Sequence, residues 1–121
     1  MNKKRVLIID DDPRNIFALV HTLRARCYDC LSCLSANEAI LILETNEVID
    51  AILIDMMMPD LDGYDAIPII KKIPSRENIT IIAVTAQAMT GDKEKCFLAG
   101  ADAYISKPVD VDKLLVALPK I

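Results

Sequence analysis

The stretch VLIIDDDPRN, residues 6–15, predicts how the fold begins. Its four apolar residues, Val6 to Ile9, are typical of a buried strand, and three consecutive carboxylates, Asp10 to Asp12, follow them directly. Two unit charges about 4 Å apart repel each other by roughly 4 kcal/mol at an effective dielectric constant of about 20. Because strands do not usually end in crowded like charges, we expect a cation to offset this repulsion.

Outward from this stretch, short aliphatic segments alternate with segments of helical period. We expect strands at residues 5–9, 29–34, 51–54, 79–84 and 103–105, and helical segments around 16–23, 36–45, after 63, 91–99 and 110–118. In the first helix, Ile16, Leu19, Val20 and Leu23 follow the spacing of one buried face. Five β–α units with short links predict an α/β fold, with a doubly wound, five-stranded parallel sheet covered by helices on both faces.

Two residues bear on where the helices end or bend. Gly100 stands where a C′ glycine would end the fourth helix. Pro68 lies inside the third helical segment, where proline removes one backbone hydrogen bond. The third helix therefore either starts late or is kinked, and both alternatives stay open at this point.

Length and charge limit the class of protein. The 121 residues fit a single domain, residues 1–121, of which 53% are hydrophobic and 26% charged, as in an ordered globular chain. A net charge of −4 argues against partners such as nucleic acid or anionic lipid. The apolar run after Lys3-Lys4-Arg5 is too short for a signal peptide or a membrane span. We therefore expect a cytoplasmic location and no membrane partner.

Three of the four cysteines form a C-x-x-C-x-x-C run, Cys27, Cys30 and Cys33, and Cys96 lies far along the chain. Such a run suggests an iron–sulfur or zinc site, or else small buried side chains in a reducing compartment. We favour the second interpretation, because residues three apart on the expected strand 29–34 point to opposite faces of the sheet.

The polar residues that end the expected strands indicate the functional edge. Asp10 and Asp11 end the first strand, and Asp55, Thr85 and Lys107 end the third, fourth and fifth. In open α/β sheets ligands bind outside the carboxyl ends of the strands. Oxygen ligands of this kind suit a magnesium-like cation, which would offset the repulsion at the first strand. Asp12 directly precedes Pro13, so we expect it to act mainly as a helix N-cap.

Four motifs carry a resemblance to a known family over the whole chain. They are LIIDDDP at 7–13, ILIDMMMPDLDGYD at 52–65, IIAVTA at 81–86 and AGADAYISKP at 99–108. Together they resemble the receiver domain of two-component response regulators, and DDDPRNIFAL and TAQAMTGDKEKC are most similar to receivers attached to hybrid histidine kinases. The resemblance implies the flavodoxin-like strand order 2-1-3-4-5 and a cis peptide bond between Lys107 and Pro108.

The resemblance also implies a function and roles for individual residues. Asp55 would accept a phosphoryl group from a phosphohistidine, and Thr85 and Lys107 would contact the phosphoryl oxygens. Mg²⁺ would be held by Asp11 and Asp55, by Asp10 largely through water, and by the backbone carbonyl of Met57. Such a module is not an enzyme, since it catalyses only its own phosphorylation and dephosphorylation. Its partners would be a histidine kinase or histidine phosphotransfer domain and a downstream output protein or domain.

Two further roles follow from the same resemblance. Phosphorylation would move Thr85 toward the phosphoryl group and bring Tyr104 inward, so that these two residues form the conformational switch. Met57 and Gln87 would tune hydrolysis, and an apolar Met57 predicts a long phosphoryl lifetime. The face of the fourth helix, fifth strand and fifth helix would be the output surface, and whether the chain forms a homodimer on phosphorylation stays open.

Other interpretations are weaker. A flavin or nucleotide module would need a Gly/Ser/Thr-rich phosphate loop where Asp10–Asp12 stand, and a magnesium-dependent phosphatase would turn over small phosphoesters. DLDG at 60–63 resembles phosphatase and EF-hand motifs but lacks their flanking residues, so we expect only a loop turned by Gly63. His21 and Ser106 are expected to be surface and strand residues. The chain fits either a free-standing regulator or part of a hybrid kinase.

Overall fold

The computed structural model describes residues 3–86 and 91–120, which form five parallel strands alternating with five helices. The strands are β1 (Arg5–Ile9), β2 (Asp29–Cys33), β3 (Ala51–Asp55), β4 (Thr80–Thr85) and β5 (Ala103–Ser106). The helices are α1 (Pro13–Ala25), α2 (Ala36–Leu43), α3 (Gly63–Lys71), α4 (Asp92–Ala99) and α5 (Val111–Ala117). The sheet has the order β2-β1-β3-β4-β5, which confirms the predicted flavodoxin-like α/β fold.

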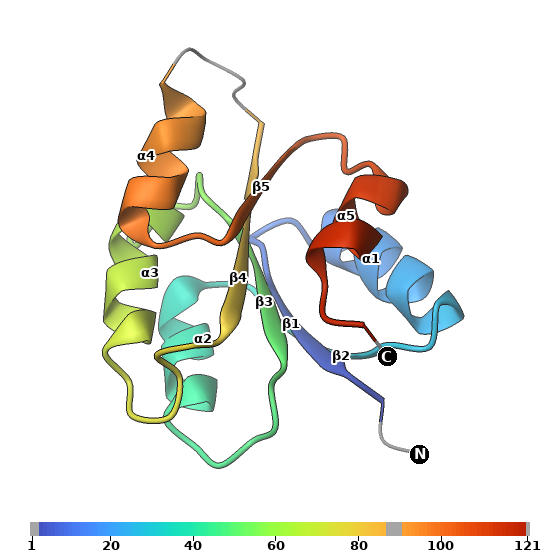
Figure 1. The fold of residues 1–121 in the computed structure, drawn as a ribbon, viewed down its shortest axis with the longest axis horizontal. Helices are drawn as coiled ribbons and strands as arrows, with labels where there is room; N and C mark the ends of the chain where they lie inside the picture. The colour runs from blue at the N-terminus through green and yellow to red at the C-terminus, as the bar shows by residue number, and fades with distance from the viewer. Residues whose placement is uncertain (1–2, 87–90, 121) are drawn as a thin grey trace.

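The helices form a layer on each face of the sheet (Figure 1). Helices α2, α3 and α4 cover one face, and α1 and α5 cover the other. All five residues of β3 are buried, as expected for a central strand covered on both sides. Full burial of a Val, Leu or Ile side chain contributes about 1.5–3 kcal/mol relative to exposure, so the two apolar layers account for much of the stability.

Alternation along β2 settles the interpretation of the cysteines. Cys33 packs in the apolar cluster on the α2–α4 side of the sheet, whereas Cys30 packs in the cluster on the α1–α5 side. Both thiols are buried and free, and burial raises their pKa, that of Cys33 to about 12. Cys30 and Cys33 are therefore core side chains on opposite faces of the sheet and cannot share a metal, as predicted, whereas Cys27 is exposed.

The helices begin and end close to the predicted positions. Side-chain caps start four of them, and these are provided by Asp12, Ser35, Asp62 and Asp110. Helix α3 begins at Gly63, before Pro68, so the late start considered from the sequence is wrong. Gly100 ends α4 in the left-handed conformation, with a φ of 118°, which confirms its predicted role.

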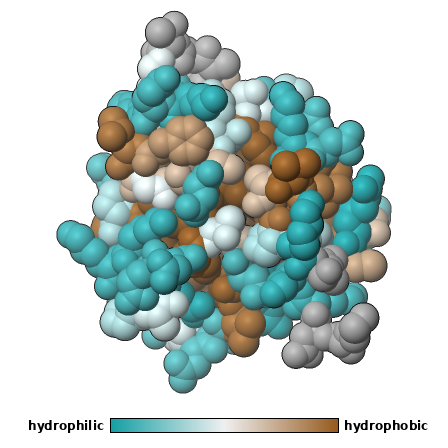
Figure 2. All heavy atoms as spheres, in the orientation of Figure 1, coloured by the Kyte–Doolittle hydropathy of each residue, from teal (hydrophilic) through white to brown (hydrophobic). Residues whose placement is uncertain are grey.

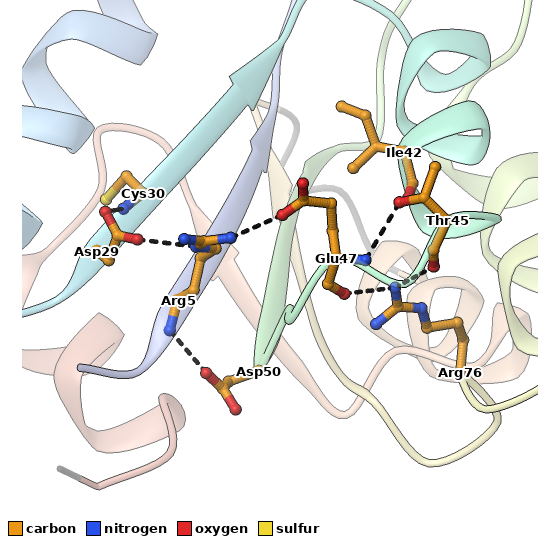
Figure 3. Close-up of polar contacts among 8 residues, drawn as sticks. All are labelled: Arg5, Asp29, Cys30, Ile42, Thr45, Glu47, Asp50 and Arg76. Carbon is orange, nitrogen blue, oxygen red and sulfur yellow. Dashed lines mark hydrogen bonds and ion pairs between the residues drawn. The ribbon is translucent and has the colours of Figure 1, made fainter. Parts of the chain in front are cut away.

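Two arginines fasten the amino-terminal edge of the sheet (Figure 3). Arg76 is buried, and its guanidinium donates hydrogen bonds to the carbonyl oxygens of Leu43, Thr45 and Glu47 at 3.0, 3.1 and 2.7 Å. Figure 3 shows the bonds to Thr45 and Glu47. These carbonyls lie at and beyond the end of α2, where helical partners run out. Arg76 therefore joins the connection between α2 and β3 to the connection between α3 and β4, in which it lies.

Arg5 ties the first strand to its neighbours at the same edge. Its guanidinium contacts the carboxylates of Asp29 and Glu47, each at 2.8 Å, and its backbone N–H donates to Asp50 at 2.7 Å. The hydrogen bond from Arg5 is the largest cause of the lowered pKa of Asp29. Charges at this edge are thus matched by partners.

No helix within residues 3–86 and 91–120 combines the length and the hydropathy that crossing a bilayer would require.

Candidate functional site

The predicted polar residues lie together at the carboxyl-terminal edge of the sheet. Asp10 and Asp11 follow β1, Asp55 ends β3, and Thr85 ends β4. Lys107 follows β5, and its backbone N–H donates to the carbonyl of Thr85 at 2.8 Å. Four parallel strands end side by side, so residues far apart in sequence meet at one edge.

Three carboxylates form the centre of this site. Single oxygens of Asp10, Asp11 and Asp55 all lie within 4.8 Å of one another. Asp10 and Asp55 are buried, with 3% and 5% of their surface exposed, while Asp11 faces solvent. Two buried carboxylates beside an open third make a hard, oxygen-rich cradle that is accessible from one side. This set of donors fits a divalent cation such as Mg²⁺.

Lys107 provides the positive charge at the site. Its Nζ lies 3.0 Å from Oδ2 of Asp55 and 3.5 Å from Oδ2 of Asp10. Burial lowers the pKa of Lys107, but the two carboxylates outweigh burial and leave the pKa raised. The ammonium is therefore charged at neutral pH. The bond between Lys107 and Pro108 is cis, as predicted.

Asp55 is held by two donors in an otherwise unfavourable environment. Its Oδ1 accepts a hydrogen bond from the backbone N–H of Met57 at 2.9 Å, and its Oδ2 accepts one from Lys107. Burial is the largest influence on its pKa, which is raised, and nearby Asp10 acts in the same direction. Both influences disfavour the ionised carboxylate, so a bound cation would relieve them.

Asn15 belongs to the site although we did not single it out from the sequence. Its Nδ2 donates to Oδ2 of Asp10 at 2.6 Å, while the backbone N–H of Asp12 donates to Oδ1 at 2.9 Å. The sequence could have indicated this role, because Asn15 stands three residues after the helix cap Asp12, where side chains often reach back toward the preceding loop. Asn15 therefore orients Asp10.

Asp12 caps α1 as predicted. Its carboxylate accepts a hydrogen bond from the backbone N–H of Arg14 at 3.0 Å, and Pro13 occupies the first turn of the helix. That hydrogen bond is the largest cause of its lowered pKa. Asp12 thus differs in role from the two preceding aspartates.

The two residues predicted to form a switch lie on adjacent strands. Thr85 is fully buried, and Tyr104 is partly buried and packs against the apolar cluster on the α2–α4 side. Met57 exposes 48% of its surface beside Asp55. Gln87, predicted to tune hydrolysis together with Met57, lies outside the described residues.

The loop after β3 turns for a different reason from the one expected. The left-handed residue in this loop is Asp60, with a φ of 68°, whereas Gly63 lies in the first turn of α3. A Cβ on Gly63 would lie 2.4 Å from Sδ and 2.9 Å from Cα of Met56. Glycine is therefore needed for close packing rather than for a positive φ.

His21 and Ser106 are not members of the acidic cluster. His21 is exposed on α1, where its ring stacks on Phe17 with centroids 6.2 Å apart. Ser106 is an exposed residue at the end of β5, paired in register with Thr85. Both positions agree with the surface and strand roles predicted for them.

Comparison with known proteins identifies a family and relatives for this chain. The sequence matches the family described as response regulator receiver domain over residues 6–119. The signal transduction histidine-protein kinase BarA of Escherichia coli is 35% identical over 109 residues, which are 90% of this chain and 12% of the kinase. The chain thus spans about an eighth of the length of this curated relative. The predicted similarity to receivers of histidine kinases is confirmed.

Two solved structures share the fold. The receiver domain of sensor histidine kinase PA1611 from Pseudomonas aeruginosa has a TM-score of 0.84 and 33% identity, covering 93% of this chain and 92% of that one, and it holds a magnesium ion in its active-site cleft. A receiver domain from Saccharomyces cerevisiae, solved with a histidine phosphotransfer protein, has a TM-score of 0.83 and 27% identity, covering 93% and 83%.

Proposed function

The chain belongs to the response regulator receiver domain family, and from this premise we propose that Asp55 accepts a phosphoryl group from a phosphohistidine. A receiver domain is a signalling module of two-component phosphorelays rather than an enzyme. The observation that carries the proposal is the pairing of a buried Asp55 with Lys107 inside a cluster of three carboxylates. In this proposal residues 1–121 act as one receiver unit.

Asp55 suits the role of nucleophile better than its two neighbours. Asp10 lies farther from the lysine, with 3.5 Å between its Oδ2 and Nζ of Lys107, and Asn15 holds the same oxygen. Asp11 is exposed to water, which would solvate its charge. Asp55 is buried on the central strand β3, and among the described residues it contacts Lys107 at 3.0 Å. Negative charge that develops during transfer would therefore lie beside an ammonium.

Mg²⁺ would be held by Asp11 and Asp55, by the backbone carbonyl of Met57, and by Asp10 largely through water. Three carboxylates against one ammonium leave the site with an excess of negative charge, which favours a divalent cation. The similar PA1611 receiver holds magnesium in its active-site cleft. When bound, the cation would offset the repulsion between the carboxylates and withdraw charge from the phosphoryl oxygens.

The transfer itself needs little covalent chemistry from the protein. A carboxylate oxygen of Asp55 forms a bond to phosphorus as the P–N bond of the donor breaks, and the electron pair of that bond leaves with the imidazole. Lys107 and the Thr85 hydroxyl contact the phosphoryl oxygens and stabilise their charge. Water later cleaves the acyl phosphate, which regenerates Asp55 and releases phosphate.

Switching would depend on contacts that differ between the two states. Thr85 moves toward the phosphoryl group, and Tyr104 turns inward into the space beside β4. Thr85 and Tyr104 lie on the neighbouring strands β4 and β5, where Tyr104 pairs in register with Ala83, two residues before Thr85, so a movement of one would change the space available to the other.

Helix α1 is the proposed contact surface for a histidine kinase or a histidine phosphotransfer domain. Phe17 exposes 74% of its surface one turn beyond Pro13, so an apolar side chain stands close to the acidic cluster. A groove beside it is lined by Ile16, Val20 and Ser32. The similar yeast receiver was solved with a histidine phosphotransfer protein.

The face formed by α4, β5 and α5 would bind the output partner. Phe97 and Leu98 on α4 and Val116 on α5 are exposed, and apolar residues are visible on this side of the surface (Figure 2). This face would bind a downstream protein or domain, or a second copy on phosphorylation. Because the chain is acidic, nucleic acid is not the proposed partner, and we propose a cytoplasmic location.

The deciding experiment uses a small acyl-phosphate donor and intact mass measurement. We expect one added phosphoryl group that requires both Mg²⁺ and Asp55, so that Asp55→Asn gives no adduct. The exposed neighbour provides the control, because Asp60→Asn removes a carboxylate in the adjacent loop and should leave the adduct intact. Steady phosphate release without an adduct would instead indicate a phosphatase, and neither product would show that the cluster is structural.

A matched pair of donors tests the role of α1. With a phosphorylated histidine phosphotransfer domain as donor, Phe17→Ala should slow transfer by at least about tenfold if the exposed ring is a central contact. With the small donor the same variant should react like the wild type, because Phe17 does not touch Asp55. Equal rates of the two proteins with both donors would exclude α1 as the contact surface.

A substitution of Met57 tests the predicted long lifetime of the acyl phosphate on Asp55. Met57→Asn places an amide beside Asp55 that can orient water, so the acyl phosphate should decay faster than in the wild type. Decay at the same fast rate in both proteins would refute the prediction.

A further inference from the structure

Lys107 stands between two buried carboxylates and lies closer to one of them. Its Nζ is 3.0 Å from Oδ2 of Asp55 and 3.5 Å from Oδ2 of Asp10. The side chains of Asp10 and Asp55 are almost equally buried, with 4% and 6% of their surface exposed. Burial therefore does not explain why the ammonium lies nearer to Asp55, and the cause has to be sought in the other donors around the two carboxylates.

The two aspartates receive the same kind of backbone donor on one oxygen. Oδ1 of Asp10 accepts a hydrogen bond from the backbone N–H of Asp12 at 2.9 Å. Oδ1 of Asp55 accepts one from the backbone N–H of Met57, also at 2.9 Å. In both cases the donor stands two residues after the aspartate, where a strand of the sheet ends. The difference between the two carboxylates therefore lies at Oδ2.

At Oδ2 one aspartate has a neutral donor and the other has a cation. Oδ2 of Asp10 accepts a hydrogen bond from Nδ2 of Asn15 at 2.6 Å, a shorter distance than that to Lys107. Asn15 is the third residue of α1, so the start of this helix brings its amide to the end of β1. Oδ2 of Asp55 accepts its hydrogen bond from Lys107 at 3.0 Å. Asn15 thus holds the oxygen of Asp10 that would otherwise compete with Asp55 for the lysine.

A neutral donor suits this position, because it satisfies the carboxylate without cancelling its charge. A buried acceptor needs a hydrogen-bond partner. A cation in place of Asn15 would supply one, but it would also offset the negative charge that attracts a divalent metal ion to the three clustered carboxylates. The amide of Asn15 supplies the hydrogen bond and leaves the charge of the cluster unchanged.

We infer that Asn15 is a positioning residue for phosphoryl transfer: its amide occupies Oδ2 of Asp10 and thereby leaves Lys107 to Asp55. This inference rests on the proposed function, since it gives Asn15 the placement of the ammonium that contacts the phosphoryl oxygens. Asn15 acts through Lys107, and its effect is the difference between the 3.0 Å and the 3.5 Å contact of that lysine.

Removal of the amide should move Lys107. Oδ2 of Asp10 would lose the donor at 2.6 Å, and the ammonium 3.5 Å away is able to replace it. Charges attract each other more strongly in a buried site than in water, so Lys107 should shift toward Asp10 and away from Asp55. A misplacement of about 1 Å can lower a rate about 100-fold. Transfer should therefore be slower even when the metal site is full.

The first measurement is a crystal structure of Asn15→Leu without metal, since leucine is neutral and similar in size to asparagine but donates no hydrogen bond. We expect Nζ of Lys107 to lie closer to Oδ2 of Asp10 than to Oδ2 of Asp55. Asn15→Ala, which adds no bulk to the site, should show the same exchange. Asn37→Leu is the matched control, because Asn37 is an exposed asparagine in the first turn of α2. A lysine that stays nearer to Asp55 in both Asn15 variants would overturn the inference.

Kinetics at saturating Mg²⁺ separate the placement of Lys107 from metal binding. Calorimetry gives the Kd of each variant for Mg²⁺, so that all proteins are compared with the metal site filled. With a small acyl-phosphate donor, Asn15→Leu should form the adduct at least about tenfold more slowly than the wild type. In a Lys107→Ala background the same substitution should slow the reaction less than about twofold, because the ammonium that Asn15 places is gone.

The outcomes separate this inference from the proposed function. Equal slowing with and without Lys107, or a wild-type rate in Asn15→Leu once Mg²⁺ is saturating, would overturn the inference. A wild type that forms no adduct would instead count against the proposed function. The crystal structure of Asn15→Leu would still test the placement of Lys107 in that case, because it needs neither the metal nor the phosphoryl donor.

Discussion

At the amino-terminal edge of the sheet two arginines are matched by carbonyl or carboxylate oxygens, whereas at the carboxyl-terminal edge a lysine contacts two of three clustered carboxylates. Arg76 is buried among three carbonyl oxygens, and Arg5 lies between Asp29 and Glu47. At the other edge, Asp55 is buried close to Asp10, and its pKa is raised. One edge is therefore arranged for stability, while the other retains electrostatic repulsion that a ligand can relieve.

This contrast shows how the fold accommodates an unfavourable site. Parallel strands bring all their carboxyl ends to one edge and all their amino ends to the other. Repulsion at the acidic edge is tolerated because the two apolar layers and the arginine contacts stabilise the rest of the sheet. Substitutions at the two edges should consequently have opposite effects on stability.

The largest effect is expected at the paired edge. Arg76→Ala should lower the free energy of unfolding by about 3 kcal/mol, because it leaves carbonyl oxygens at the end of α2 without donors. Urea denaturation measures this loss. Arg14→Ala is the control, since that side chain is almost fully exposed and its removal should change stability by less than about 0.5 kcal/mol. A loss as small as in the control would show that the buried guanidinium is dispensable.

A slightly smaller effect is expected from Mg²⁺ at the acidic edge. At 100 times its Kd, Mg²⁺ should raise the free energy of unfolding of the wild type by about 2.7 kcal/mol. The increment should survive in Arg76→Ala, because Arg76 lies at the opposite end of the strands from the acidic cluster, and should fall sharply in Asp55→Asn. Thermal unfolding with and without the ion measures it. Equal increments in wild type and Asp55→Asn would place the ion elsewhere.

Without metal, Asp55→Asn should stabilise the protein by about 1 kcal/mol. It removes one of two buried carboxylates that compete for Lys107. The raised pKa of Asp55 fixes the pH dependence. The cost of its charge is fully present above the folded pKa and disappears as the pH falls through that pKa toward the unfolded value.

The gain in the Asn variant should accordingly be largest at neutral pH and shrink under mild acid, as followed by urea denaturation at several pH values. Asp60→Asn, in the exposed loop beside it, should show no such dependence. A destabilised Asp55→Asn would mean that the contact with Lys107 outweighs the repulsion.

The smallest effect is expected at Asp29, where the substitution should destabilise the protein, whereas Asp55→Asn should stabilise it. Asp29→Asn should lower the free energy of unfolding by less than about 1 kcal/mol, since the contact with Arg5 is partly exposed and screened by salt. The pKa of Asp29 is lowered, so its contribution is present above the unfolded pKa and is lost as the pH falls through the folded pKa. Repeating the denaturation in high salt should reduce the difference, and a salt-independent loss would point to packing instead.

Much of the site was predictable because each signal is local. The alternation of aliphatic and helical segments predicts a parallel sheet, and the residue after each strand predicts which side chains meet at its edge. Asp12 before Pro13 likewise identifies a helix cap, since capping depends on neighbours within one turn. These inferences need only spacing and residue type.

Other features were decided only by the tertiary structure, because they join residues far apart in the chain. The contact of Arg76 with Leu43 spans 33 residues, and that of Tyr64 with Asp92 spans 28. Gly63 is required by its closeness to Met56, not by a turn conformation. Neither residue spacing nor propensity specifies which buried donor finds which acceptor. That choice depends on how the helices pack on the sheet.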